Sequence, residues 1–352
     1  MELTIDDIAF GGKGVGRLEG KAVFVPFTID GERVAARITR EKKNLAEAEL
    51  ETVLEPSIHR TQPECPYFGE CGGCTYQHIS YPHQLAIKAQ QVEQTLRRIA
   101  QLSDVPMQPI VPSPRPYGYR NRITVHAQDG LVGYFRREAH HLIDVEQCPI
   151  AAPEVNHALT ELRASRPRDG HYTLRAQAAP RVFAQTNDAV AEALAQHVVG
   201  LMPTRADLLV DAYCGAGFFA KRLTAQFERV LGLEWDRHAV AAAQKNMAPN
   251  ESYIAADAGR ELRHALISAE PAATAVIVDP PATGLTDVIR RALLETVVQT
   301  FVYVSCNPAT LARDLRELGA VYSVRSVTPF DMFPQTAEIE VAVHLFPSAK
   351  NQ

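Results

Sequence analysis

The first 56 residues consist of short runs of strand-forming residues divided by glycine-rich turns. The longest glycine-rich stretch, Gly11–Gly16, predicts a turn. Evenly spaced short strands predict a small OB-like β-barrel for residues 1–56. The pattern fits an oligonucleotide-binding barrel and a plain packing module equally well. The four predicted strands are Met1–Ile5, Lys21–Phe27, Arg33–Thr39 and Ala46–Leu54.

Residues 57–182 predict a second, central α/β domain. It opens with a cysteine-rich stretch, Cys65–His78, and an apolar stripe at helical spacing then predicts a helix over residues 81–101. We expect this helix to pack on the domain that follows. Pro112, Pro114 and Pro116 predict an extended linker. The remaining predicted elements are strands Arg122–Ala127, Leu131–Arg136 and His171–Ala176, with a helix near Pro153–Ser165.

From residue 183 to the end, strands and helices alternate. This rhythm predicts a parallel, doubly wound sheet of the Rossmann type, which binds ligands at the carboxyl ends of its strands. The predicted strands are Leu208–Val210, Val230–Leu233, Ser252–Ile254, Ala275–Val278 and Phe301–Val304.

Composition adds only general limits. The 352 residues are 46% hydrophobic and 22% charged, as in an ordinary globular protein. No apolar run is long enough for a membrane span, and Met1–Thr4 does not resemble a signal peptide, so we expect a cytoplasmic protein with reduced thiols. A net charge of −5 neither supports nor excludes a nucleic-acid partner, because phosphate contacts depend on local charge. No segment resembles a dedicated interface, so we expect a monomer.

The strand at Leu208–Val210 runs into a loop with the pattern Gly-x-Gly-x-x-Ala, which contains Gly215 and Gly217 and follows Asp211. Glycines let a backbone approach a nucleotide closely, and we expect a helix N-terminus after them. Glu234 ends the next strand and is placed to accept hydrogen bonds from ribose hydroxyls, and Asp257 follows the third strand, where we expect it to hold an adenine edge. The loop alone does not distinguish a dinucleotide from S-adenosylmethionine.

Three further segments predict chemistry at this same edge. Asp279 opens an Asp-Pro-Pro turn, Cys306 lies in Ser-Cys-Asn-Pro, and Glu340 ends the segment that starts at Phe333. A cysteine can act as a covalent nucleophile and a carboxylate as a base. Each also has a plain structural interpretation: Cys306 as a packed strand end, Glu340 as a solvated charge and Asp279 as a helix N-cap. Cys214, beside the glycine loop, is expected only to pack.

Four cysteines predict a metal centre. Cys65, Cys71 and Cys74 are close together, and Cys148 is distant in sequence. Four thiolates bind zinc or an iron–sulfur cluster. A zinc site usually takes two Cys-x2-Cys pairs, so three close cysteines with one remote cysteine fit a [4Fe–4S] cluster better. Unconnected reduced thiols are the alternative.

Together these residues resemble the RNA 5-methyluridine methyltransferases that carry a TRAM domain and an iron–sulfur cluster. The resemblance covers nearly the whole chain, including Cys71-Gly72-Gly73-Cys74, Ser305-Cys306-Asn307-Pro308 and Phe183-Ala184-Gln185-Thr186-Asn187. It implies transfer of a methyl group from S-adenosylmethionine to uridine C5 in rRNA or tRNA. It further implies RNA contact by the barrel, Cys306 as nucleophile, Glu340 as base, and a structural [4Fe–4S] cluster on Cys65, Cys71, Cys74 and Cys148. By resemblance, Gln185, Tyr213, Glu234 and Asp279 belong to the cofactor site.

Two positions depart from the family pattern. Ala282 stands where the family usually has Arg, and Glu338 stands where it usually has His. A second carboxylate near Glu340 is expected to raise the pKa of one of the pair. These departures motivate an alternative, an RNA-binding iron–sulfur protein with impaired catalysis. A nicotinamide dehydrogenase, suggested by the glycine loop alone, leaves Cys306 and the cysteine centre unexplained.

Overall fold

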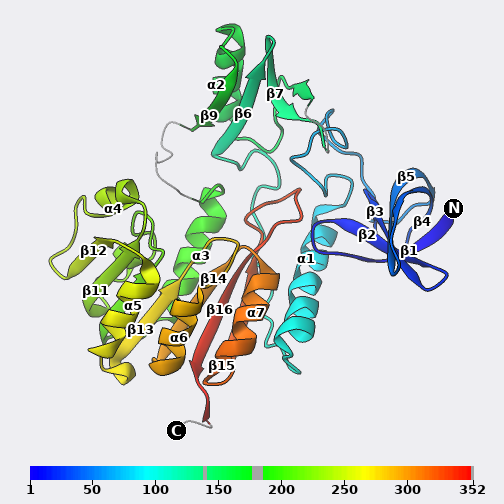
Figure 1. Cartoon of the computed structure of the whole chain (residues 1–352). Helices are drawn as coiled ribbons and strands as arrows, with labels where there is room; N and C mark the ends of the chain where they lie inside the picture. The colour runs from blue at the N-terminus through cyan, green and yellow to red at the C-terminus, as the bar shows by residue number, and fades with distance from the viewer. Residues whose placement is uncertain (138–140, 177–184, 350–352) are drawn as a thin grey trace. The chain divides into compact units, whose positions relative to one another are not determined.

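The computed structural model describes residues 1–137, 141–176 and 185–349. The chain divides into two compact units (Figure 1). The first unit comprises Met1–Gln91, Ser113–Ala179 and Phe333–Glu338. The second unit comprises Val92–Pro112, Pro180–Met332 and Ile339–Gln352. The sequence-based domain boundaries at 56 and 182 stay predictions, since this division follows contacts and not chain order.

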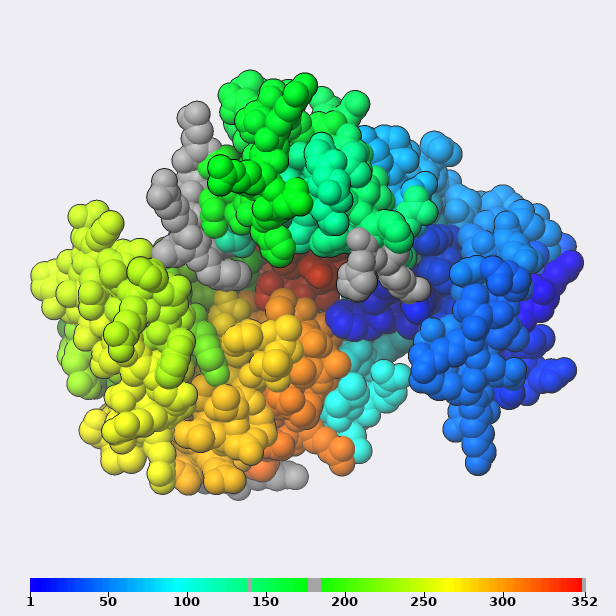
Figure 2. Space-filling view, turned by 45° about the horizontal axis from the view of Figure 1, so that its top comes forward, coloured from blue at the N-terminus to red at the C-terminus, as the bar shows by residue number. Residues whose placement is uncertain are grey.

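A closed five-stranded barrel begins the first unit, as predicted. Its strands follow the order β1-β2-β3-β5-β4, and alternate residues such as Ile5, Val25 and Val34 point into its buried core. In the space-filling view the N-terminal barrel residues are drawn in blue (Figure 2). The strands are β1 (Glu2–Ile8), β2 (Lys13–Leu18), β3 (Lys21–Pro26), β4 (Arg33–Glu41) and β5 (Leu45–Glu55).

The predicted glycine-rich turn is only half correct, because most of it is strand β2. Gly11 and Gly12 have φ values of +96° and +91° and form the turn. Gly14 and Gly16 lie in the strand, where an added Cβ would stand 1.9 Å from Thr28 Oγ1 and 2.3 Å from Thr4 O, respectively. These two glycines therefore serve close packing of the barrel and not chain reversal.

The rest of the first unit contains the cysteine-rich segment, most of helix α1 (Tyr81–Thr95) and a four-stranded antiparallel sheet of order β8-β7-β6-β9. Helix α2 packs against β9. The predicted strands and helix are confirmed, and one short strand, β8, was not predicted. The bounds are β6 (Arg122–Gln128), β7 (Leu131–Phe135), β8 (Leu142–Asp144), β9 (Gly170–Arg175) and α2 (Pro153–Ala164).

The second unit is built on a seven-stranded sheet of order β12-β11-β10-β13-β14-β16-β15. Five strands are parallel, as predicted, but the sequence pattern did not predict β15 and β16. β16 pairs antiparallel with both β14 and β15, so β15 runs in the same direction as the five parallel strands. The strands are β10 (Ala206–Ala212), β11 (Phe227–Glu234), β12 (Glu251–Ala255), β13 (Thr274–Val278), β14 (Thr300–Ser305), β15 (Tyr322–Phe330) and β16 (Glu340–Pro347).

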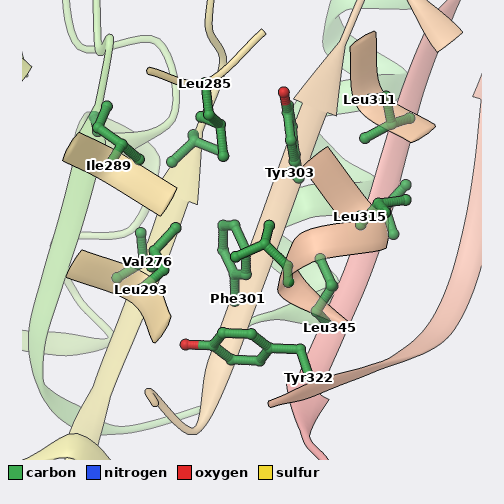
Figure 3. Close-up of a cluster of buried hydrophobic side chains, with 14 of the residues drawn as sticks. Val276, Leu285, Ile289, Leu293, Phe301, Tyr303, Leu311, Leu315, Tyr322 and Leu345 are labelled. Carbon is green, nitrogen blue, oxygen red and sulfur yellow. The ribbon is translucent and has the colours of Figure 1, made fainter. Parts of the chain in front are cut away.

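Helices α5, α6 and α7 cover one face of this sheet, in front of it in Figure 1. Figure 3 shows Phe301 and Tyr303 of β14 between side chains of α6 and α7, such as Leu293 and Leu315. Their complete burial makes this cluster the main core of the second unit. The helices of the unit are α3 (Asp188–Leu201), α4 (Arg237–Ala243), α5 (Ala258–Ile267), α6 (Asp287–Glu295) and α7 (Pro308–Leu318).

The end of the predicted 81–101 helix belongs to this second core. Leu96 and Ala100 lie in the π-helical turn Leu96–Ala100 and pack in the same cluster as α7. The segment before the predicted proline linker is not free, because Met107 and Val111 form parallel bridges to Val327 and Phe330 of β15. Among the described residues, no helix is long and apolar enough to cross a membrane.

Candidate active site at the carboxyl edge of the seven-stranded sheet

The glycine loop leaves β10 through a left-handed backbone. Tyr213, Gly215 and Gly217 have φ values of +65°, +54° and +82°. The amides of Tyr213 and Cys214 donate to Leu233 O at 2.8 and 3.1 Å, which fixes the loop to β11. No atom lies within 4 Å of a Cβ built on Gly215, so the backbone there is open to close approach by a ligand.

The expected helix N-terminus after this loop is wrong. Only a three-residue 3-10 turn, Ala220–Arg222, follows the glycines. Asp211 Oδ2 accepts a hydrogen bond from Ala220 N at 2.9 Å, so this turn is fixed by a buried carboxyl group. A turn this short lacks the aligned peptide dipoles that favour a pyrophosphate, which removes the main support for the dinucleotide interpretation.

Glu234 and Asp257 lie at the predicted edge but have local partners. Glu234 ends β11, and its two carboxylate oxygens accept from Gly215 N at 3.0 Å and Asp236 N at 2.9 Å. Asp257 is the N-cap of α5 and accepts from Arg260 N at 2.9 Å. This capping role of Asp257 was not predicted from the sequence. Both acids stay candidates for cofactor contact, because their carboxylates can accept further hydrogen bonds.

Burial makes this edge electrostatically unusual. Desolvation, together with the charges of Asp279 and Glu234, raises the pKa of Asp211 to about 8, although the hydrogen bond from Ala220 N opposes this rise. Desolvation also raises the pKa of Asp279 to about 7. A bound cation would favour the ionised form of these grouped acids, whereas a phosphate would oppose it, so the edge fits a positively charged ligand better than a phosphate. This charge pattern fits the sulfonium of S-adenosylmethionine.

Cys306 and Glu340 are brought together by the unpredicted antiparallel strand. β14 pairs with β16 in the register Val304↔Ala342 and Ser305↔Val341. Continuing this register by one residue sets Cys306 opposite Glu340, at the edge where the parallel strands end. Glu340 is 3% exposed, so its interpretation as a solvated charge is wrong. Strand alternation places Glu340 and Asp211 on the sheet face opposite α5, α6 and α7.

The Asp-Pro-Pro loop is tied to the start of α7. Asp279 follows β13 directly, and its amide donates to Ala212 O at 3.3 Å. Ala282 O accepts from Asn307 Nδ2 at 3.1 Å and from Thr310 Oγ1 at 3.0 Å. Asn307 is also the N-cap of α7. The N-cap of α6 is Thr286, so the interpretation of Asp279 as a helix cap is wrong.

Asp314 is a residue that the sequence analysis missed. It is 0% exposed, and Oδ2 accepts from Tyr303 OH at 2.7 Å and Leu285 N at 2.8 Å. Arg290 and Arg313 donate to Oδ1, and Arg313 Nη2 also donates to Thr283 O at 3.0 Å. Asp314 thereby joins β14, α7 and the loop after Asp279. An acid on the apolar side of an amphipathic helix was the available signal.

The two departures from the family pattern lie in different settings. Ala282 contributes its carbonyl to the loop tether, so this contact does not depend on its side chain. Glu338 is exposed in the first unit, and its amide donates to Thr336 Oγ1 at 3.2 Å.

Gln185 lies two residues before Asn187, the N-cap of α3. Phe183 and Ala184 of the same predicted segment lie outside the described residues.

The cysteine centre belongs to the first unit. Burial raises the pKa values of Cys65 and Cys71, and that of Cys74 to about 12, and the charge of Cys148 shifts all three in the same direction. The four thiols are therefore close enough to repel one another as thiolates, which a bound cation would relieve. Among the described residues, however, no three Cys, His, Asp or Glu side chains form a ready metal site.

Asn156 of α2 holds the distant cysteine, a role that the sequence analysis missed. Its Oδ1 accepts from Cys148 N at 2.8 Å, and its Nδ2 donates to Cys148 O at 3.0 Å. Gln77 Oε1 likewise accepts from Cys65 N at 3.1 Å. Both ends of the cysteine set are thus fixed through their backbones.

Cys214 is confirmed as a packing residue by its surroundings. It is 4% exposed, and burial raises the pKa of its thiol, as do the charges of Asp211 and Glu234. A buried thiol among carboxyl groups is held protonated and is a poor nucleophile.

Comparison with known proteins agrees with this geometry. The family model "tRNA (Uracil-5-)-methyltransferase" matches residues 166–347, and the TRAM domain model matches residues 1–50. An uncharacterized RNA methyltransferase of Thermosynechococcus vestitus is 30% identical, covering 99% of this chain and 98% of its own length. One from Bdellovibrio bacteriovorus is 31% identical, covering 98% and 94%.

A solved structure shares the fold along nearly the whole chain. It is the Pyrococcus abyssi tRNA (uracil-54, C5)-methyltransferase in complex with S-adenosyl-L-homocysteine, with a TM-score of 0.75 and 23% identity, covering 98% of this chain and 99% of that one. The barrel and the glycine loop thus occur in a chain that belongs to the tRNA (uracil-5-)-methyltransferase family and carries a TRAM domain.

Proposed function

We propose that this protein transfers a methyl group from S-adenosylmethionine to C5 of a uridine in structured RNA, either rRNA or tRNA, through a covalent adduct on Cys306. The observation that supports the proposal is the β14–β16 register, whose last pair is Ser305↔Val341, so that Cys306 and Glu340 are the next residues along the two strands. The family match and the TRAM match to residues 1–50 support an RNA substrate.

The nucleophile comes first. C5 of uracil is a weak nucleophile while the ring is aromatic. Addition of the Cys306 thiolate to C6 forms an S–C6 bond and leaves an enolate whose electron density lies on C5. S-adenosylmethionine, when bound, supplies the methyl group as an electrophilic carbon on its sulfonium. The C5–methyl bond then forms as the S–methyl bond breaks.

The base completes the reaction. Glu340 takes the remaining proton from C5, the C5–C6 double bond re-forms, and the bond from C6 to Cys306 breaks to restore the thiolate. Glu340 is nearly completely buried, so little water reaches its carboxylate. Because both ring faces must be reachable, the target uridine has to leave its stack in an RNA loop.

The cofactor site is proposed on the same geometry. Gly215 allows close backbone approach, and Gly217 has a positive φ and packs against Tyr253 and Lys221. Glu234 is assigned to the ribose hydroxyls. The acidic edge attracts the sulfonium. The full proposed set is Gln185, Asp211, Tyr213, Gly215, Gly217, Glu234, Asp257 and Asp279.

We assign a structural [4Fe–4S] cluster to Cys65, Cys71, Cys74 and Cys148. The assignment is supported by the donor set, because four thiols that interact electrostatically in one segment would lose their protons on binding a cationic cluster. The methyl transfer needs no redox step, so we assign these residues to holding the first unit together and not to the reaction.

The test uses RNA that contains 5-fluorouridine, with S-adenosylmethionine and anaerobically purified protein. Fluorine at C5 cannot leave as a proton, so the reaction should stop after methyl transfer and leave a protein–RNA adduct stable to denaturation. We expect the adduct to map to Cys306 by peptide mass and to be lost in Cys306→Ala. The recovered RNA identifies the substrate. No adduct from any cellular RNA pool, with cofactor bound, would favour the impaired RNA-binding protein.

A further inference from the structure

The segment Phe333–Glu338 connects two strands of the second unit but belongs to the first unit. Met332 before it and Ile339 after it both belong to the second. Glu340 follows only two residues beyond the end of this segment. Two residues of extended chain span about 7 Å at most, so the place of the segment limits the place of Glu340.

Gln335 is the centre of this attachment. Its carbonyl accepts from both Thr75 N and Tyr76 N at 3.0 Å. Its amide donates to Gln84 Oε1 at 3.1 Å, and Gln84 Nε2 donates back to Gln335 Oε1 at 3.0 Å. Gln84 and Gln335 are 0% and 2% exposed, so this reciprocal pair, here called the glutamine clamp, is shielded from water.

Neighbouring residues hold the same segment from two other sides. Lys88, on α1, donates to Phe333 O at 3.0 Å, and Tyr119 OH donates to Pro334 O at 3.0 Å. Ala337 packs in the core cluster of the barrel. Six residues therefore receive contacts from α1, from the residues after Cys74, from Tyr119 and from the barrel core, far more than a connecting loop requires.

The backbone of Gln335 also points to a fixed geometry. Its φ is +70°, a left-handed conformation that a glutamine adopts only when its surroundings impose it. The contacts at its amide, carbonyl and side chain impose this conformation. Such local strain, maintained by a buried network next to a catalytic group, is typical of a device that sets position.

We propose that the glutamine clamp is a positioning device for Glu340, and that it acts on release of the product. Gln84 and Gln335 are positioning residues, because they touch neither substrate nor cofactor. The inference rests on the proposed function, in which Glu340 removes the C5 proton. Glu340 is the first residue of β16 and pairs with Phe330, so the clamp restricts the chain directly before this pair, and loosening the clamp gives Glu340 more freedom than Cys306, which follows β14. The proton-removal step then slows, and the earlier steps at Cys306 continue.

The experiment is a single-turnover reaction with labelled S-adenosylmethionine and substrate RNA. Two quantities are measured: total methyl label in RNA, and the share of that label in a denaturation-stable protein adduct. In Gln84→Leu we expect methyl transfer within about threefold of the wild type and release roughly 10- to 100-fold slower, so that methylated adduct accumulates. A merely structural loss would lower both steps equally and leave no adduct.

The matched control is Gln91→Leu. Gln91 is also a buried glutamine on α1, 5% exposed, but its amide donates to Ile8 O, Ala9 O and Tyr76 OH and not to the clamped segment, which Tyr76 contacts through its backbone amide. We expect this variant to be destabilised and to accumulate no adduct. Gln335→Gly is the second clamp variant, should Gln84→Leu fold poorly. It keeps the backbone contacts, suits the positive φ, and is expected to show the same adduct at a lower level.

Glu340→Gln separates the clamp from the function on which it depends. If this variant accumulates methylated adduct and neither clamp variant does, the clamp proposal is wrong while the assigned base stands. Equal slowing of methyl transfer and release in Gln84→Leu overturns the clamp as well. If Glu340→Gln accumulates no adduct, the assignment of the base fails, and the clamp fails with it.

Discussion

At the scale of one residue, Trp235 lies next to the proposed cofactor edge and can report ligand binding there by its fluorescence. It is the single tryptophan of the chain, it is 76% exposed, and it follows Glu234 at the end of β11. A ligand that reaches Glu234 must change the surroundings of the neighbouring indole. Tryptophan fluorescence therefore reports binding without labels.

We expect S-adenosylmethionine to change the Trp235 emission in a saturable way, and NAD to leave it unchanged. Glu234→Gln should raise the Kd for S-adenosylmethionine by roughly 10- to 100-fold, because a charged acceptor for the ribose is lost. Fluorescence titration gives both values. Saturable binding of NAD with similar affinity would contradict the reading of the acidic edge as a site for a cation.

The raised pKa of Asp211 makes the stability of the folded protein depend on pH. Its pKa is raised by burial to about 8 in the folded protein, against 3.8 as its ordinary value. The folded state therefore holds a proton that the unfolded state releases between these two values. The contribution of Asp211 to the free energy of unfolding is fully present below pH 3.8 and is lost as the pH rises toward 8.

We expect cofactor-free protein to lose thermal stability between pH 5 and 8, and Asp211→Asn to reduce this slope by roughly 1 kcal/mol per pH unit or less. Thermal melts across that range measure the effect. Glu228→Gln, at an exposed position on the same sheet, is the control and should keep the wild-type slope. An unchanged slope in Asp211→Asn would contradict a protonated Asp211.

At the scale of elements, Asn307 connects two loops at the active edge. Its Oδ1 caps α7 by accepting from Ala309 N at 3.0 Å, and its Nδ2 donates to Ala282 O at 3.1 Å. One side chain thus both starts the helix after Cys306 and ties the loop after Asp279. Two substitutions separate these roles.

Asn307→Ala removes both contacts and should cost about 1–2 kcal/mol of stability, together with most of the activity. Asn307→Asp keeps the cap but loses the donor to Ala282. We expect it to retain nearly wild-type stability and still to methylate RNA more slowly. Denaturant unfolding and initial methylation rates measure the two effects. Full activity in Asn307→Asp would show that the loop needs no tether.

The strands of the second unit show which elements the sequence pattern could predict and which it could not. Five parallel strands and their edge were predicted, because continuous apolar runs followed by Gly, Asp or Cys are local signals. β16 was not predicted, since its partners β14 and β15 set its role through pairing across the sheet. Without β16, nothing in the sequence places Glu340 beside Cys306.

At the scale of the whole molecule, the cysteine centre draws on distant parts of the first unit. Cys148 is held by Asn156 of α2, and Cys74 lies one residue before the contact of Thr75 with the clamped segment. Loss of a metal there should therefore loosen more than its own loop.

We expect anaerobically purified protein to contain iron and sulfide, and Cys148→Ser to lose most of both. Its melting temperature should fall by several degrees, since a cluster bound only by the folded state adds to stability. Cys214→Ser, a substitution of a cysteine outside the set, should retain its iron. Equal iron content in the two variants would remove Cys148 from the proposed ligands.

The sequence by itself determined the barrel, the parallel part of the sheet, the glycine loop and the chemical identity of the candidate groups, because each rests on local spacing or residue type. Tertiary structure alone decided how these groups are used. It replaced the expected helix N-terminus by a 3-10 turn, turned Gly14 and Gly16 into packing positions, and buried Asp314 under three elements. It also made Phe333–Glu338 part of the first unit, although the residues on both sides of this segment belong to the second unit. Each of these depends on atoms that come together only when remote segments pair, which no local pattern records.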